Sequence, residues 1–388
     1  MDLYTRSKRQ RVIVFFEIDV VLFIAYVKGY QKLKILLFGE FSGLHNNLKD
    51  GLVELGHDVT IAAGSDGYKS FSNDISLESS LPGLLGQLDT RIRPFLNFPK
   101  LSGFDVVQIV NPFFPNAKYF PRHFFYLMLR HFNDKFFVSA AGSDAYYWRN
   151  GRKKLKYGPF DDFLKYDAKT LSFYMSRDDA FAYNKRIVEN SDGLIPVMYE
   201  YELSYQGSEK LRKTIPLPVN TNKIEYRENV VHEKLVVFHG LSRYGFKGTR
   251  HVEEAFEILT KTYPNDIECI IDGQLPINEY LELMSRTNVV IDQTYSYSLG
   301  MNGVYALAMG KVVLGGAEPE GLKSLGVEIS PVINILPNKK SIVLEVEKLL
   351  ANRTSIPQLG FDGRKFVEDV HCHVKVAQKY INTWNAIV

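Results

Sequence analysis

The 388-residue chain has little of what marks secreted, nucleic-acid-binding or metal-dependent proteins. Its two cysteines, Cys269 and Cys372, are too few for a disulfide framework and fit a reducing cytoplasm. Its formal net charge of +3 is too small for strong attraction to the phosphates of a nucleic acid. No Asp-x-Asp sequence offers paired carboxylates to a metal ion, and the tract His371-Cys372-His373 matches no familiar zinc spacing. These absences predict a cytoplasmic protein with no nucleic-acid partner, no metal site and no other cofactor.

The chain also lacks a long uninterrupted apolar run. Residues 12–27 are mostly apolar, but Glu17 and Asp19 interrupt them. A membrane-spanning helix needs about 20 apolar residues with few charges, so this stretch does not predict one. A basic cluster precedes it, as in a signal peptide, but no clean cleavage site follows. We therefore predict that residues 1–32 are an upstream extension or a peripheral membrane anchor, and that the folded protein begins near Lys32.

What the chain does have is a regular alternation of apolar strands and amphipathic helices. Residues 34–39 and 57–64 predict buried strands, and residues 42–56 between them predict a helix, which gives a β-α-β unit of a parallel sheet. Residues 149–184 are irregular, and the alternation restarts after a polar stretch at 221–234. Further strands are predicted at 105–112, 135–144, 191–198, 234–240, 267–273, 288–293 and 311–316, and helices at 122–132, 248–263, 277–287 and Arg364–Trp384.

Two such units in succession predict an α/β fold of two Rossmann-like domains that face each other across a cleft. We assign residues 33–218 to the first domain, 219–370 to the second, and 371–388 to a C-terminal helix that packs on the first. Ligands of open α/β sheets bind beyond the carboxyl ends of the strands. The candidate site therefore consists of the residues that follow each strand.

The strand ends of the first domain carry small and polar residues. The turn from Gly39 to Gly43 follows the first strand, but it lacks the Gly-x-Gly-x-x-Gly spacing of a dinucleotide site. It is either a tight strand-to-helix connection or a loop that lets an acceptor molecule approach. The candidate residues on this side are Gly39, Glu40, Gly43, His45, Asn111 and Ser143, with Asp144 at the end of the strand 135–144.

Two segments of the second domain are suited to a phosphate group. In residues 239–249, Arg243 and Lys247 lie in a loop between a strand and a helix. There an arginine fork and a lysine charge can clamp a diphosphate, the alternative being two solvated surface cations. In residues 296–316, glycines surround a short apolar helix whose first N–H groups can receive an anion, yet this segment contains no carboxylate. Because both segments follow strands of one sheet, we expect them to converge at its edge.

These motifs resemble the donor-binding domain of GT-B glycosyltransferases, most of all glycosyltransferase family 4. The family's Arg and Lys-Gly after the first strand of this domain match Arg243 and Lys247-Gly248. Residues 140–144 resemble its His-Gly-x-Asp strand end, with Ala141 in place of the histidine. The resemblance covers about residues 33–388. The family's later glycine motif matches at Gly300, Ala306, Ala308, Gly310 and Lys311.

The resemblance implies a metal-independent hexosyltransferase that moves a sugar from a nucleotide-diphosphate sugar to a glycan or lipid-linked acceptor in surface polysaccharide synthesis, with retention. Arg243, Lys247 and the helix start would neutralise the departing diphosphate, which lowers the barrier. Asp144 would orient the acceptor or the sugar, the alternative being a carboxylate that caps the loop after its strand. The implied donor-binding residues are His239, Ser242, Arg243, Lys247, Gly248, Gly273, Tyr297, Gly300, Met301, Asn302, Gly303 and Tyr305.

The sequence departs from the family at both glutamates of the later motif, which fall on Tyr297 and Tyr305. A tyrosine keeps a hydrogen-bonding hydroxyl but loses the charge, so contacts with the sugar or ribose change. Two alternatives to the transferase follow. One is a GT-B protein that binds a sugar nucleotide without turnover. The other is a nucleotide-sugar epimerase, for whose acid and base set the chain offers Asp144, Glu40, His45 and His239.

Two basic segments of the first domain, residues 121–135 and 148–158, add a prediction about location. Each alone is typical of a packed helix or a solvated loop. Together they predict a patch that docks on anionic lipid at the inner face of the plasma membrane. A lipid-linked acceptor would then meet the cleft directly.

Overall fold

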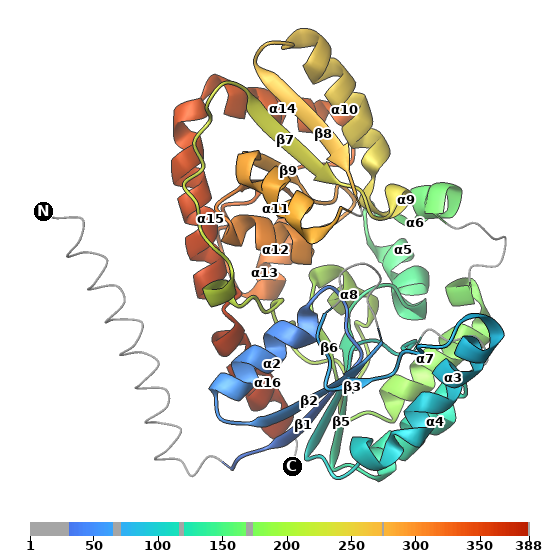
Figure 1. The fold of residues 1–388 in the computed structure, drawn as a ribbon. Helices are drawn as coiled ribbons and strands as arrows, with labels where there is room; N and C mark the ends of the chain where they lie inside the picture. Colours follow the sequence, from blue (N-terminus) through green and yellow to red (C-terminus); the bar gives the residue numbers. More distant parts are fainter. Residues whose placement is uncertain (1–30, 65–70, 116–119, 168–173, 274, 387–388) are drawn as a thin grey trace, which may run out of the picture.

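Two parallel β-sheets organise the chain, which confirms the predicted α/β fold (Figure 1). The structure is a computed structural model that describes residues 31–64, 71–115, 120–167, 174–273 and 275–386. The first sheet has the strand order β3-β2-β1-β4-β5-β6 and the second β11-β10-β9-β7-β8. The strands are β1 (Lys34–Phe38), β2 (Asp58–Ala63), β3 (Ile75–Ser76), β4 (Val106–Ile109), β5 (Lys135–Ala140), β6 (Gly193–Pro196), β7 (Leu235–Gly240), β8 (Ile267–Asp272), β9 (Val289–Ile291), β10 (Val312–Gly315) and β11 (Ile333–Asn334).

Helices cover both faces of each sheet, and the burial of the strands reflects this. Ile35, Leu36 and Leu37 of β1 are all fully buried although they point alternately to opposite faces. A parallel strand covered on both sides needs such a continuous apolar run, which is why the strand positions could be predicted. The helices of the first half are α2 (Leu44–Glu54), α3 (Gly83–Leu96), α4 (Arg122–His131), α5 (Arg152–Lys154), α6 (Phe160–Asp162), α7 (Asp178–Glu189) and α8 (Tyr199–Ser204).

The second half adds helices that the sequence predicted only in part. The helix expected between 277 and 287 is present, whereas α13, α14 and β11 were not predicted. The helices from the second half to the C-terminus are α9 (Tyr244–Lys247), α10 (Thr249–Thr262), α11 (Ile277–Arg286), α12 (Met301–Ala308), α13 (Pro319–Leu325), α14 (Lys339–Ala351), α15 (Ile356–Val370) and α16 (His373–Asn385). The segment 149–184, predicted to be irregular, contains α5, α6 and the start of α7.

The prediction of a single long helix from Arg364 to Trp384 is wrong, because this segment consists of the end of α15 and most of α16, with a break between them. The backbone of Val219 pairs with the residues at the break: its N–H donates to the carbonyl of His371 at 2.7 Å, and its carbonyl accepts from the N–H of His373 at 3.2 Å. Beyond the break, α16 packs on the first sheet, where Nε1 of Trp384 donates to Oε1 of Gln108 at 3.0 Å. The C-terminal helix thus returns to the first half.

The predicted N-terminal extension and its apolar stretch at 12–27 lie outside the described residues, apart from residues 31 and 32. Across the parts of the chain that the structure describes, no helix combines the length and the apolar character needed to cross a membrane.

Candidate functional site

The loop with the two predicted cations follows β7 and contains α9. Lys247 is 7% exposed, and its Nζ donates to the carbonyl oxygen of Gly240 at 3.0 Å. The same nitrogen lies 4.0 Å from Oδ1 of Asp292. Arg243 is exposed, and its guanidinium carbon lies 3.7 Å from the centre of the Phe246 ring. One cation is therefore held inside the second half and the other lies at its surface.

Arg243 faces the first half of the chain. Burial raises the pKa of Tyr147 and of Tyr201, and the positive charge of Arg243 partly opposes that rise. A cation has such an effect on a neighbouring hydroxyl only at short range. Arg243 therefore lies near these two residues of the first half.

The start of α12, the predicted phosphate-binding helix, is held by a carboxylate. The N–H of Gly300 donates to Oδ2 of Asp292 at 2.9 Å. A Cβ at Gly303 would lie 3.0 Å from the same oxygen, so the helix approaches Asp292 closely. Asp292 is buried directly after β9 and also lies beside Lys247. The cation loop and the helix start thus meet at this carboxylate, which was not among the predicted site residues.

A second carboxylate, Glu200 of α8 in the first half, holds the loop before α12. Glu200 is buried, and its Oε1 accepts from the N–H of Tyr297 at 2.6 Å and of Ser298 at 3.2 Å. The hydroxyl of Ser296 donates to the same oxygen. Its Oε2 has no hydrogen-bond partner among the described residues, and burial raises the pKa of Glu200. A side chain of one half therefore fixes a loop of the other.

A third carboxylate reaches α9 from the first half. Oδ1 of Asp167 accepts from the N–H of Gly245 at 3.0 Å, and Oδ2 accepts from the N–H of Phe246 at 2.7 Å. A Cβ at Gly245 would lie 2.1 Å from the carbonyl oxygen of Asp162, so only glycine permits this contact. The glycine segment 296–316 lacks acids of its own, and Asp167, Glu200 and Asp292 supply carboxylates around it and α9 from elsewhere in the chain.

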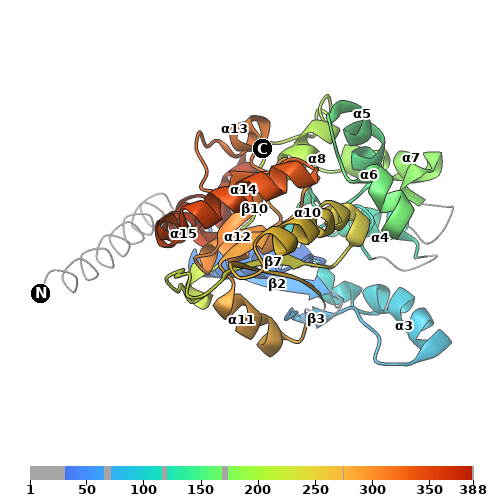
Figure 2. The ribbon, with the colours of Figure 1, turned by 90° about the horizontal axis from the view of Figure 1, so that it is seen from above.

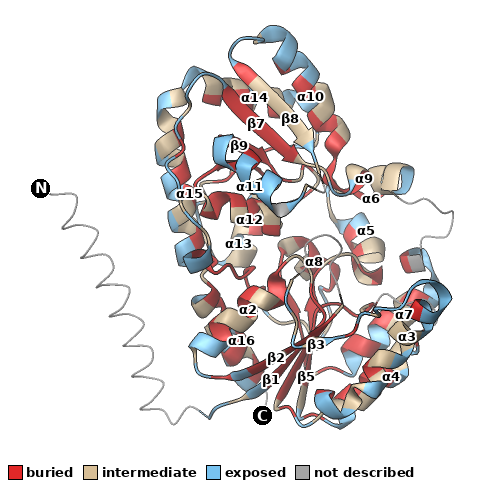
Figure 3. Cartoon of the chain, in the orientation of Figure 1, coloured by how far each residue is buried: buried red, intermediate tan, exposed pale blue. Residues whose placement is uncertain are grey.

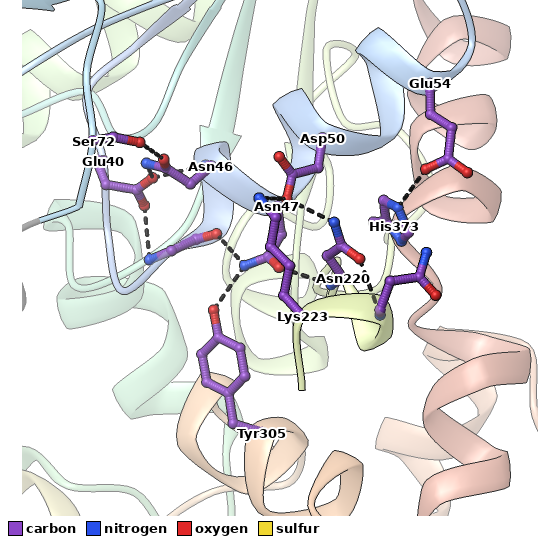
Figure 4. Close-up of polar contacts among 12 residues, drawn as sticks. Glu40, Asn46, Asn47, Asp50, Glu54, Ser72, Asn220, Lys223, Tyr305 and His373 are labelled. Atoms are coloured by element: carbon purple, nitrogen blue, oxygen red, sulfur yellow. Dashed lines mark hydrogen bonds and ion pairs between the residues drawn. The ribbon is translucent and has the colours of Figure 1, made fainter. Parts of the chain in front are cut away.

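The two tyrosines at the family's glutamate positions both bond to the first half. The ring of Tyr297 stacks on Tyr157 with centroids 4.7 Å apart, and its hydroxyl accepts from the N–H of Lys156 at 3.0 Å. The hydroxyl of Tyr305 accepts from Nδ2 of Asn47 at 2.7 Å (Figure 4). In this arrangement each tyrosine links the halves, and their role as donor contacts stays a prediction.

Helix α2 is the element at which the halves and the C-terminal helix meet (Figure 4). Oδ1 of Asn47 accepts from the N–H of Asn220, at the start of the second half, at 2.8 Å. One turn further, Asp50 pairs with Lys223 at 2.6 Å. At the end of α2, Glu54 bonds to Nε2 of His373 at 2.8 Å. His373 is therefore bonded to a carboxylate of α2. Within the described ranges, no three side chains of metal-binding types lie together as a group that could hold a metal ion.

The turn from Gly39 to Gly43, which was predicted to lie on the acceptor side, is closed by Glu40 within it. Oε1 of Glu40 accepts from the N–H of Gly43 at 2.9 Å, and Oε2 accepts from the N–H of Asn46 at 2.8 Å, so Glu40 caps α2. His45 is fully buried, and burial lowers its pKa to about 4. Its neutral ring donates from Nδ1 to the carbonyl of Gly39 at 2.6 Å. This geometry is that of a tight strand-to-helix connection.

Asp144 also has the contacts of a carboxylate that caps the loop after its strand. It is fully buried, and its Oδ1 accepts from the N–H of Tyr147 three residues on, at 2.8 Å. Oδ2 accepts from the hydroxyl of Tyr205 at 2.6 Å. Asn111 supports the same turn, because its Nδ2 donates to the carbonyl of Ala141 at 2.8 Å. The capping role is therefore observed, and a catalytic role for Asp144 stays a prediction.

We expect Asp144 to make stability depend on pH. Burial raises its pKa to about 6 in the folded protein. A carboxyl group with a raised pKa contributes most to stability below its unfolded pKa, and this contribution is lost as the pH rises through the folded value. From about pH 4 to about pH 7, wild type should lose about 3 kcal/mol of unfolding free energy relative to Asp144→Asn. Urea unfolding at several pH values measures this difference, and parallel curves for the two proteins would contradict it.

The remaining predicted donor residues lie around the same edge of the second sheet. His239 is buried with both ring nitrogens bonded, Nδ1 to the carbonyl of Ile291 and Nε2 to the hydroxyl of Thr249, each at 2.9 Å. Burial lowers its pKa to about 3, so the ring is neutral. Ser242 is exposed in the loop before α9, Gly248 joins α9 to α10, Gly273 follows β8, and Met301 and Asn302 open α12. Ser143, an acceptor-side candidate, follows β5 of the first sheet.

Comparison with known proteins shows the fold. No family model matches the chain, and no curated protein matches its sequence. Sucrose-phosphate synthase from Thermosynechococcus elongatus is similar in structure with a TM-score of 0.59 and 16% identity, over 91% of this chain and 98% of that one. HepE from Anabaena in complex with UDP-glucose gives 0.57 and 12%, over 91% and 100%. UDP-GlcNAc 2-epimerase from Neisseria meningitidis gives 0.51 and 11%, over 91% and 100%. The chain therefore has the GT-B fold.

Proposed function

We propose that this protein is a glycosyltransferase that moves a sugar from a nucleoside-diphosphate sugar to a glycan or lipid-linked acceptor, with retention and without a metal ion. The observation that carries the proposal is that Lys247 and the N–H of Gly300, at the start of α12, both lie beside Asp292 directly after β9. Similar structures include one in complex with UDP-glucose, which supports a sugar nucleotide as the donor. Surface polysaccharide synthesis is the setting that we propose for it.

In this proposal each group at the carboxyl edge of the second sheet has a task. Arg243 is exposed and can pair with a phosphate as a fork, whereas Lys247 is a buried point charge. The N–H of Gly300 bonds to Asp292. A diphosphate therefore accepts from the N–H groups that follow Gly300 in the first turn of α12. These groups neutralise charge that grows on the diphosphate as the glycosidic bond breaks. The acceptor hydroxyl passes its proton to a phosphate oxygen.

A second candidate is a GT-B protein that binds the sugar nucleotide without turnover. The observation in its favour is that Tyr297 and Tyr305, which stand at the family's glutamate positions, bond to Lys156 and Asn47 of the first half. The epimerase is less well supported, because Glu40 and Asp144 cap backbone N–H groups and the ring of His239 is bonded at both nitrogens.

Turnover in the presence of EDTA tests the proposal. We expect one member of a panel of nucleotide sugars to release its nucleoside diphosphate at a rate that EDTA does not change, because protein cations replace the metal. A rate abolished by EDTA and restored by manganese would contradict the metal-independent mechanism. Tight binding with no release for any donor would favour the second candidate.

A further inference from the structure

Asp292 lies at the start of α12, where the proposed function places an anion. Its Oδ2 accepts from the N–H of Gly300 at 2.9 Å, and its Oδ1 lies 4.0 Å from Nζ of Lys247. Figures 1 and 2 show α12 against the second sheet, whose strand β9 ends directly before Asp292. A carboxylate of the chain therefore already neighbours Lys247 and the helix start, the two groups assigned to the diphosphate.

This carboxylate is held in place by its surroundings. The side chain of Asp292 is 2% exposed. A Cβ at Gly303 would lie 3.0 Å from its Oδ2 and one at Gly300 would lie 3.4 Å from it, so α12 packs directly on the carboxylate. The neighbouring strands β7 and β9 and most of α12 are buried as well (Figure 3). The packing leaves the side chain little room to swing away, so its charge stays when a ligand binds.

The fixed charge of Asp292 opposes the attraction between Lys247 and a phosphate. Lys247 is buried, and charges in such a place act on each other more strongly than they do in water. Together the ammonium group and the carboxylate carry no net charge. A phosphate beside them is attracted by the one and repelled by the other, and the remaining attraction comes from Arg243 and the N–H groups after Gly300.

We propose that Asp292 makes the site select against the extra negative charge of a free nucleoside diphosphate. In a nucleotide-diphosphate sugar each phosphate carries one negative charge, because esterification leaves it one ionisable oxygen. In the free diphosphate the terminal phosphate has a second ionisable oxygen, with a pKa of about 6. Repulsion from Asp292 therefore weakens binding of the free diphosphate more than binding of the sugar nucleotide. The inference rests on the proposed function and names the residue that sets its preference between the two ligands.

This preference favours release of the product. When the bond between the sugar and the terminal phosphate breaks, the bonding electrons stay on a phosphate oxygen. The proton that this oxygen takes from the acceptor hydroxyl is lost to water above about pH 6. The diphosphate then carries one negative charge more than the donor did, and Asp292 repels it so that the next donor replaces it.

Titration calorimetry of the full-length chain at pH 8 tests the proposal, with UDP, ADP and GDP and the glucose conjugate of each as probes. Asp292→Asn keeps an oxygen that accepts from the N–H of Gly300 but loses the charge. It should bind the diphosphate at least about fivefold more tightly than wild type, and the preference for the conjugate should fall at least about threefold. Asp362→Asn makes the same change at an exposed position of α15, and it should bind both ligands as wild type does.

Two results of these titrations would overturn the proposal. One is weaker binding of the diphosphate by Asp292→Asn, which would make Asp292 a positioning residue for Lys247. The other is an unchanged ratio of the two affinities, which would remove this inference and leave the proposed function in place. If wild type binds none of the probes, the proposed function fails and this inference fails with it.

A second measurement needs no variant and serves if Asp292→Asn does not fold by circular dichroism. Wild type is titrated with the diphosphate and with its terminal methyl ester, which has one charge fewer and no sugar. We expect the ester to bind at least as tightly as the diphosphate. Tighter binding of the diphosphate would contradict the proposal.

Discussion

Lys247→Ala should weaken the binding of a nucleoside diphosphate by more than about tenfold, because a charge-assisted hydrogen bond to phosphate contributes about 1.5–3 kcal/mol. Lys247 is the buried cation beside Asp292, so its loss also leaves that carboxylate without its positive neighbour. Titration calorimetry of wild type and variant measures the change in affinity.

Two further variants separate lost binding from lost folding. Arg243→Ala changes an exposed side chain, so it should weaken diphosphate binding while the Tm stays within a few degrees of wild type. Lys261→Ala removes an exposed lysine on α10 and serves as the control, with unchanged affinity. If Lys247→Ala and Arg243→Ala both bind the diphosphate as wild type does, the assignment of the diphosphate site is wrong.

Glu200→Ala should lower the free energy of unfolding by about 3 kcal/mol or more, since it leaves the buried N–H groups of Tyr297 and Ser298 without their acceptor. Because this loop leads into α12, the variant should also weaken diphosphate binding. Glu200→Gln keeps an amide oxygen that can accept, so its effect should be smaller. Urea denaturation and calorimetry measure the two effects.

The control for Glu200 is Glu209→Ala, which removes an exposed glutamate a short distance along the chain. It should unfold at the urea concentration of wild type. If Glu200→Ala unfolds there as well, Glu200 does not hold the two halves together, and the loop before α12 owes its position to other contacts.

The strands could be predicted from sequence because their signal is local. Ile35, Leu36 and Leu37 form a continuous apolar run, and a buried parallel strand needs such a run wherever it lies in the chain. The break between α15 and α16 could not be predicted in this way. It depends on the pairing of Val219 with His371 and His373, residues more than 150 positions along the chain, and no glycine or proline marks it.

The same distinction applies to the site. The cation loop and the glycine segment have local motifs, and the structure places Lys247 and Gly300 on either side of one carboxylate. The three carboxylates themselves have no motif. Asp292 directly follows a strand, which is a weak signal. Asp167 bonds to helix α9 and Glu200 to the loop before α12, both in the other half. Their role follows only from tertiary packing.

The most direct test of the central claim is a crystal structure of the protein with the nucleoside diphosphate that the release assay selects. We predict a diphosphate held between Arg243, Lys247 and the N–H groups at the start of α12. A nucleotide bound elsewhere, with these groups still committed to Asp292 and the carbonyl of Gly240, would contradict the account.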